Sequence, residues 1–169
     1  KKISYEKGEA DCYLLLAANY GSRANYNAAI QHALSAAHIY HDLKDFNDEA
    51  ATGLIIQSCY REILDYTNSL YYAFQGKELA EAHNLYGNAI NFPGQRLAPL
   101  YLAEIGSTYV RMNKLDSALF YTQRSIDENE LFNGTTWGFP IYLLATIQRM
   151  KGNYKAAHKN YHRSITLSI

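Results

Sequence analysis

The chain has 169 residues, of which 48% are hydrophobic and 19% are charged, and its 16 basic and 16 acidic side chains give a formal net charge of zero. This length allows one folded domain with a sizeable apolar core. The balanced charge argues against an overall attraction to nucleic acid or anionic lipid, and no apolar run approaches the ~20 residues of a membrane-spanning helix. We therefore expect neither a nucleic-acid partner nor a membrane span in this segment.

Helical periodicity runs through the whole chain. Apolar residues are spaced by three and four between the few prolines, and no stretch alternates as a strand hairpin would. In chain order we predict helices near 4–20, 25–42, 46–63, 66–84, 96–112, 115–128, 138–151 and 154–167. The longest loops are expected from Tyr86 to Gln95 and from Glu128 to Gly138. The predicted fold class is all-α.

Four segments share a pattern in which a small residue follows an aromatic residue or Leu by three positions. They are Tyr26 to Ala29, Tyr66 to Ser69, Leu115 to Ala118 and Tyr154 to Ala157, at intervals of 40, 49 and 39 residues. Two more positions continue each stripe: Ala33 and Ala36, Ala73 and Gly76, Thr122 and Ser125, Tyr161 and Ser164. Stripes of mostly small residues let two helices approach closely.

A preceding helix in each unit carries residues that recur in step with these segments. They are Tyr13, Leu16, Ala17 and Tyr20, then Ile56 and Tyr60, then Leu102, Ile105, Gly106 and Tyr109, then Ile141, Leu144 and Ala145. Large and small neighbours such as Ile105 and Gly106 allow the next helix to come close, which a Leu at the small position would prevent. The pattern predicts four helix pairs.

This pattern resembles the tetratricopeptide repeat family. The best matches are the third unit, Leu102-Ala-Glu-Ile105-Gly106-Ser-Thr-Tyr109, and the turn of the fourth, Gly152-Asn-Tyr154-Lys-Ala-Ala157. The second unit departs from the pattern, with Gln57 where a small residue is expected and Ser69 in place of Ala.

The resemblance implies stacked antiparallel helix pairs in a right-handed superhelix, an α-solenoid of about four repeats. These would lie near 4–42, 46–84, 96–128 and 138–167, in a single domain over 1–169. The intervals exceed the family's usual ~34 residues. In this they resemble the expanded arrays of bacterial signalling proteins, including two-component sensor kinases and helix-turn-helix regulators.

A protein- or peptide-binding function follows from the resemblance, because the first helix of each pair lines a concave surface in this family. The family's inward-facing positions fall on Leu14, Ala18, Leu54, Ser58, Arg61, Ala103, Ser107, Arg111, Tyr142, Thr146 and Arg149. The three arginines lie near helix ends, where they would either bind an acidic group of the partner together or complement the helix dipole. Because Leu14 and Ala18 occupy the matching places, we expect no Lys/Asn carboxylate clamp of the family's chaperone-binding kind.

Motifs for catalysis are missing from the sequence. It contains no glycine-rich phosphate loop, no Gly-x-Ser-x-Gly elbow and no Cys/His pair with the required context. The acidic clusters that begin at Asp45 and Asp127 are explained by N-terminal capping and by a solvated helix face, respectively. We therefore predict no catalytic residue, no cofactor and no enzymatic activity.

Two histidine pairs and two cysteines raise the question of a metal or redox site. They are His38 and His41, His158 and His162, and Cys12 and Cys59. Zinc requires three or four donors, and neither histidine pair has a third donor at ligand spacing, so we predict no metal site. Both cysteines lie inside helical patterns, and we expect them to be small buried side chains.

The chain begins Lys-Lys without Met and ends at Ile169 within a helical pattern, so we expect it to be a segment of a longer protein. Our leading hypothesis is the sensing or interaction segment of a bacterial signalling or regulatory protein, located in the cytoplasm or the periplasm. The alternative is a self-association scaffold whose partner is a second copy, because Tyr161, Ile165 and Leu167 would leave apolar surface open on the last helix.

Overall fold

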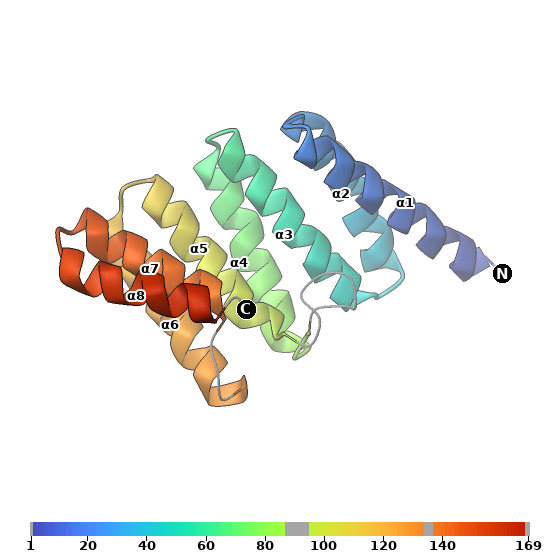
Figure 1. The fold of residues 1–169 in the computed structure, drawn as a ribbon. Coiled ribbons are helices and arrows are strands. Elements are labelled where there is room, and N and C mark those ends of the chain that lie inside the picture. The colour runs from blue at the N-terminus through green and yellow to red at the C-terminus, as the bar shows by residue number, and fades with distance from the viewer. Residues whose placement is uncertain (1, 87–94, 134–136, 168–169) are drawn as a thin grey trace. The chain divides into compact units, whose positions relative to one another are not determined.

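The computed structural model describes residues 2–86, 95–133 and 137–167, with side chains for 5–86, 95–131 and 137–167. Within these ranges the secondary structure is helical apart from one isolated antiparallel bridge between Tyr86 and Arg96 (Figure 1). The helices are α1 (Lys2–Ser22), α2 (Tyr26–Asp42), α3 (Phe46–Glu62), α4 (Tyr66–Ala82), α5 (Leu97–Arg111), α6 (Leu115–Asn133), α7 (Gly138–Met150) and α8 (Tyr154–Thr166). The all-α prediction is confirmed. In the described part of the chain, no helix combines the length and the apolarity needed to cross a membrane.

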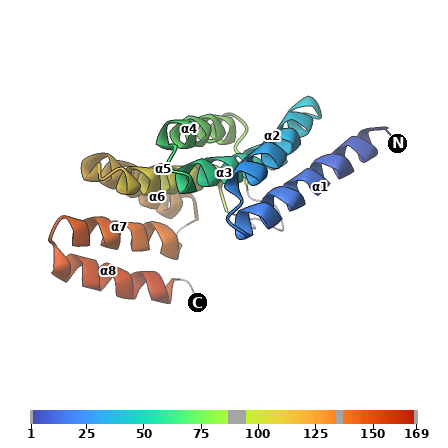
Figure 2. The same cartoon turned by 90° about the horizontal axis from the view of Figure 1, so that it is seen from above.

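The chain divides into two compact units, Lys1–Ala98 and Pro99–Ile169. The first unit contains α1 to α4, which follow one another as antiparallel neighbours (Figure 1). Seen from above, α2 and α4 lie on one side of this unit and α1 and α3 on the other (Figure 2). The second unit contains most of α5 together with α6, α7 and α8.

The loop predicted from Glu128 is too long, because α6 continues to Asn133. Ile126 and Asn129 are both buried, and Asn129 Nδ2 donates a hydrogen bond of 3.1 Å to Ser125 O. The buried face of the helix therefore extends beyond the predicted end, and the buried residue there, Asn129, is polar. Of the other predicted loop, residues 87–94 lie outside the described residues.

The turns that follow α1, α2, α3, α4, α5 and α7 share one geometry. Each contains a residue with positive φ: Ala24 (58°), Lys44 (57°), Leu64 (64°), Asn84 (50°), Asn113 (56°) and Gly152 (80°). The next residue donates its N–H to a carbonyl five positions earlier, as Asp65 does to Tyr60 at 2.9 Å, which ends the helix in a Schellman-type turn. Asp65 then caps α4 by accepting a hydrogen bond of 3.1 Å from the Asn68 N–H. Asp45 caps α3 in the same way, as predicted.

The predicted small-residue stripes are buried. Their members with at most 6% exposure include Ala29, Ala33, Ala36, Ser69, Ala73, Ala118, Thr122, Ser125, Ala157 and Ser164. A Cβ atom on Gly106 would lie 2.6 Å from Thr122 Oγ1 and 3.3 Å from both Ala118 O and Leu143 Cδ2. The close approach predicted at Gly106 is therefore present.

One expectation for α1 is wrong, because Cys12 is exposed rather than buried. Leu16 is also 42% exposed, although it occupies a recurring position. Ala10 and Ala17 are fully buried and define the face of α1 that packs into the unit, and at 3.6 residues per turn Cys12 and Leu16 fall on the other side. Cys59 is buried as predicted, and burial raises the pKa of its thiol.

Candidate functional site

The residues predicted to bind a partner divide between packing and surface positions in the first unit. Leu14 is half-buried against the core cluster of Ala10, Ala36 and Tyr40, and Leu54 is buried. These two leucines therefore stabilise the unit, whereas Ala18 is exposed and Ser58 is half-buried.

In the second unit the predicted residues are Ala103, Ser107, Arg111, Tyr142, Thr146 and Arg149. Ala103 has no exposed surface, so this position is buried rather than at a partner-binding surface. Thr146 Oγ1 lies 3.0 Å from Tyr142 O and 3.2 Å from Tyr161 Oη. Tyr142 is 52% exposed, and its ring lies 5.6 Å from that of Tyr161, so this face presents a tyrosine edge next to a hydroxyl pair.

The three arginines lie at helix ends as predicted, but in different units. Arg61 belongs to the first unit, where its side chain is 12% exposed and its Nε lies 4.0 Å from Glu62 Oε1. Arg111 and Arg149 belong to the second unit, and both are exposed. Their joint binding of an acidic group stays a prediction.

A cleft of about 350 Å³ lies in the first unit between α2, α3 and α4. Small and apolar residues form much of its lining, among them Leu34, Ala37, Gly53, Ile56, Gly76 and Leu79. Glycines at the cleft contribute no side chain, which leaves room between the helices. This volume lies at the small end of the range of ligand pockets, ~300–1,000 Å³.

The cleft lies on the other face of α3 from the predicted binding residues. Glu49, Gly53 and Ile56 line it, and their spacing of four and three places them on one face of the helix. Leu54, Ser58 and Arg61 repeat that spacing, but roughly 140° away at 3.6 residues per turn. The cleft opens instead between α2 and α4, the two helices on the same side of the unit (Figure 2).

One hydrogen-bonded pair, His41 and Glu49, lies in the cleft wall. His41 Nδ1 lies 3.0 Å from Glu49 Oε1, and the two side chains are 66% and 21% exposed, respectively. Glu49 Oε2 is buried and has no hydrogen-bond partner within the described residues. The carboxylate is therefore satisfied on one oxygen and not on the other.

Tyrosines form the aromatic part of the wall. The rings of Tyr71 and Tyr72 meet edge to face at 5.2 Å, and Tyr72 also stacks on Tyr60 at 5.5 Å. Burial raises the pKa of Tyr72, and the neighbouring Tyr60 and Tyr71 act in the same direction. Tyr72 thus stays a neutral hydrogen-bonding group, while Tyr71 is 56% exposed and available to a ligand.

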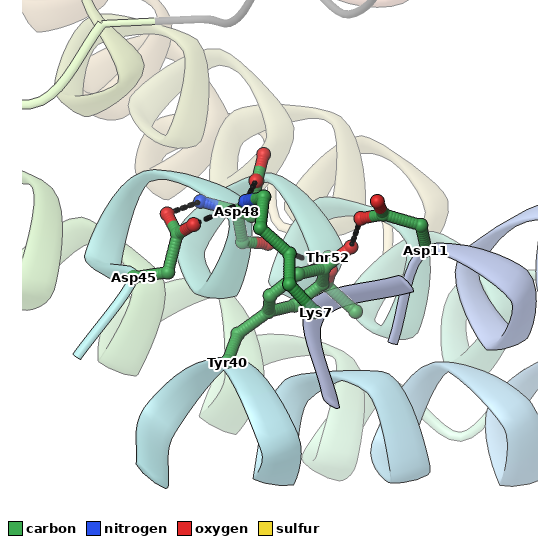
Figure 3. Close-up of polar contacts among 6 residues, drawn as sticks. All are labelled: Lys7, Asp11, Tyr40, Asp45, Asp48 and Thr52. Atoms are coloured by element: carbon green, nitrogen blue, oxygen red, sulfur yellow. Dashed lines mark hydrogen bonds and ion pairs between the residues drawn. The ribbon is translucent and has the colours of Figure 1, made fainter. Parts of the chain in front are cut away.

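A polar network holds the start of α3, the helix that carries Glu49 (Figure 3). Lys7 on α1 donates hydrogen bonds to Asp45 and, at 2.6 Å, to Asp48 Oδ2. Burial acts to lower the pKa of Lys7, but the hydrogen bonds and charges of Asp45 and Asp48 outweigh it and raise that pKa. Lys7 therefore remains protonated and ties α1 to the N-terminal turn of α3.

Tyr40 completes this network from α2. It is fully buried, and its hydroxyl donates a hydrogen bond of 2.7 Å to Asp11 Oδ1. Lys7 Nζ lies 5.4 Å from the centre of the Tyr40 ring, a cation–π distance. The network thus joins α1, α2 and α3 and positions the wall of the cleft.

Sequence reasoning missed the cleft because it projected binding positions only onto the first helix of each pair. The cleft is lined instead by the face of α3 with Glu49 and Gly53 and by Gly76 of α4, and no local pattern marks these residues as uncovered.

The two histidine pairs lie at the surface. His158 and His162 bring their Nε2 atoms within 3.2 Å, and His38 Nε2 lies 3.8 Å from Asp42 Oδ2. Among the described residues, no group of three or more His, Cys, Asp or Glu side chains is arranged to hold a metal ion.

No family model matches the chain, and no curated protein matches it in sequence. Solved structures do match it. They include the apo form of RapI (TM-score 0.76, 13% identity, 96% of this chain and 43% of that chain). The Rap conjugation gene regulator of the plasmid pLS20 in complex with the Phr* peptide gives TM-score 0.77 at 14% identity, over 95% of this chain and 42% of that one. A Rap protein complexed with competence and sporulation factor gives TM-score 0.75 at 15% identity, over 98% of this chain and 43% of that one.

This chain thus spans about two fifths of the length of those structures. At such identities the likeness shows the fold, which is a tetratricopeptide-like helical repeat.

Proposed function

We propose that this chain is a peptide-binding tetratricopeptide module and the interaction segment of a larger bacterial signalling or regulatory protein. Two similar structures support this function, one in complex with the Phr* peptide and one with competence and sporulation factor. The module acts by binding and carries out no catalysis.

The cleft between α2, α3 and α4 is the observation that favours peptide binding. It combines small apolar walls, an exposed tyrosine ring and one carboxylate paired with a histidine, which is the mixture that ligand sites use for affinity and orientation. Its volume suits one or two side chains of an extended peptide rather than a folded domain.

Fluorescence anisotropy with fluorescein-labelled pentapeptide pools tests the function and the site together. Gln75 lines the cleft and is exposed, so Gln75→Trp fills the opening without disturbing the core. Glu78→Trp places the same ring at an exposed position of α4 that does not line the cleft. We expect Gln75→Trp to weaken binding at least about tenfold and Glu78→Trp to leave it unchanged. Equal binding by wild type and Gln75→Trp would remove the cleft as the site.

The predicted arginines are the competing location for the peptide. Changing Arg61, Arg111 and Arg149 together to Ala removes the three cations that were predicted to bind an acidic group. Loss of binding in this variant, with binding retained in Gln75→Trp, would favour the arginines over the cleft.

Self-association is the second candidate function, and exposed apolar side chains on α1 and α8 favour it. Tyr5 is 74% exposed, Leu15 is 69% exposed and Ile165 is 59% exposed, whereas Tyr161 and Leu167 are half-buried. Light scattering across a concentration series tests this function. A mass that stays monomeric at every concentration would exclude it.

A further inference from the structure

The wall of the cleft contains a carboxylate with one oxygen unused. Glu49 Oε1 lies 3.0 Å from His41, and Glu49 Oε2 is buried without a hydrogen-bond partner in the described parts of the chain. A buried carboxylate oxygen without a donor carries a desolvation cost that a hydrogen bond would remove. The position therefore favours the arrival of a donor, and a cationic donor above a neutral one.

His41 covers this carboxylate loosely. Its side chain is 66% exposed, and Glu49 is the one hydrogen-bond partner that the described residues give it. Moving the imidazole aside breaks a single hydrogen bond and opens the carboxylate to the cleft. His41 is thus a displaceable cover rather than a fixed part of the wall.

The remaining surface of the cleft suits the long stem and flat head of an arginine side chain. Leu34 and Leu79 offer apolar contact to methylene groups, and the exposed ring of Tyr71 is available to a guanidinium group. Apart from Glu49 and the displaceable His41, no acidic or basic side chain among the described residues lines the cleft. Glu49 is therefore the charge that a ligand meets there.

We propose that this cleft accepts a basic side chain of the bound peptide, arginine in preference to lysine, with Glu49 as its carboxylate partner after His41 is displaced. The preference for arginine follows from its forked donors, which match both oxygens of one carboxylate, and from its stacking on aromatic rings. The inference rests on the proposed peptide-binding function and adds the class of side chain that the module selects.

Four peptide pools test the inference: fluorescein-labelled pentapeptides with random flanks and a fixed central arginine, lysine, glutamate or citrulline. Citrulline has the shape of arginine without its charge. We expect the arginine pool to bind at least about tenfold more tightly than the citrulline pool, and also more tightly than the lysine pool. The glutamate pool should bind most weakly. Equal binding of the arginine and citrulline pools would overturn the inference.

Glu49→Gln removes the charge and keeps the shape. We expect it to abolish the preference for arginine over citrulline while the affinity for citrulline stays unchanged. Glu78→Gln is the matched control, because it makes the same change at an exposed position of α4 outside the cleft, and it should keep the preference. His41→Ala should tighten the arginine pool severalfold, since one hydrogen bond need no longer be broken.

Two further outcomes separate this inference from the function on which it rests. In the first, wild type binds all pools with equal affinity and Gln75→Trp binds none of them. That outcome would support the peptide-binding function and refute the role of Glu49. Failure of every pool to bind would refute both. A cooperative thermal unfolding transition of Glu49→Gln checks that the variant is folded. Added salt should weaken binding of the arginine pool to wild type but not to this variant.

Discussion

Gln148 accepts a hydrogen bond of 2.9 Å from Asn160, at the place where the other helix pairs stack two aromatic rings. The ring pairs are Tyr20 with His32 at 5.3 Å, Tyr60 with Tyr72 at 5.5 Å, and Tyr109 with Tyr121 at 5.6 Å, each within 13° of parallel. In every pair the first residue also accepts the N–H that closes the turn, as Gln148 does from Asn153 at 2.8 Å. Each helix hairpin therefore packs two planar side chains against each other at the equivalent position.

Replacing the amide pair with tyrosines tests this equivalence. Gln148→Tyr or Asn160→Tyr alone breaks the hydrogen bond and should each cost about 1 kcal/mol. The double variant restores a stack, so we expect a favourable coupling of about 0.5–1.5 kcal/mol in a double-mutant cycle. Urea unfolding of the four proteins measures it. Strictly additive effects would show that the position does not accept stacked rings.

The glycine at position 106 should resist even the smallest enlargement. Gly106→Ala places a methyl group 2.6 Å from Thr122 Oγ1 and 3.3 Å from a backbone carbonyl, so α5 and α6 must separate slightly. We expect a loss of about 1–3 kcal/mol in the free energy of unfolding, and more for Gly106→Leu. Gly8→Ala is the control, because nothing lies within 4 Å of the added carbon and a helical alanine gains about 0.5–1 kcal/mol. The two alanine variants should therefore differ in sign.

The turn after α3 stores strain that glycine would release. Leu64 has a φ of 64° and is 63% exposed, so its side chain contributes little packing in return for a left-handed backbone. Leu64→Gly should raise the free energy of unfolding by about 0.5–1 kcal/mol. Gly152→Ala makes the reverse change at a φ of 80° and should lower stability. Thermal midpoints of the two variants and of wild type measure these changes in stability. A Leu64→Gly variant that is less stable than wild type would contradict the presence of strain at Leu64.

Much of the fold could be predicted from the sequence, because local periodicity and the spacing of small residues are enough to define helices and their close contacts. The existence of each helix, the cap at Asp45 and the close approach at Gly106 all follow from residues within a few turns of one another. The extension of α6 escaped prediction because Asn129 is a polar residue whose burial is satisfied by a backbone carbonyl.

The cleft could not be predicted in this way, because it depends on which helix faces remain uncovered. Nothing local distinguishes the uncovered face of Glu49 and Gly53 from the packed face of Leu54. The same reason explains why Ala103 was chosen as a binding residue and is in fact buried. The regular turns were a usable signal, since Asn25-Tyr26, Asp45-Phe46 and Asp65-Tyr66 recur every 20 residues.

The polar network behind the cleft should make the protein sensitive to alkaline pH. Burial and the hydrogen bond to Asp11 raise the pKa of Tyr40 above its usual 10.0. Lys7 also keeps its proton to higher pH than its usual 10.5, because Asp45 and Asp48 outweigh the effect of burial. The folded protein thus holds protons that the unfolded chain releases above about pH 10, so the free energy of unfolding falls as the pH rises further.

Tyr40→Phe tests the larger part of this dependence, because phenylalanine has no proton to lose. The variant should be less stable than wild type by about 1 kcal/mol near neutral pH, where the hydrogen bond to Asp11 is lost. Its stability should then fall less steeply above about pH 10. Tyr5→Phe changes a tyrosine that is 74% exposed and should keep the wild-type slope. Urea midpoints measured from neutral to alkaline pH give the slopes, and parallel curves for wild type and Tyr40→Phe would show that Tyr40 ionises as freely in the folded state as in the unfolded chain.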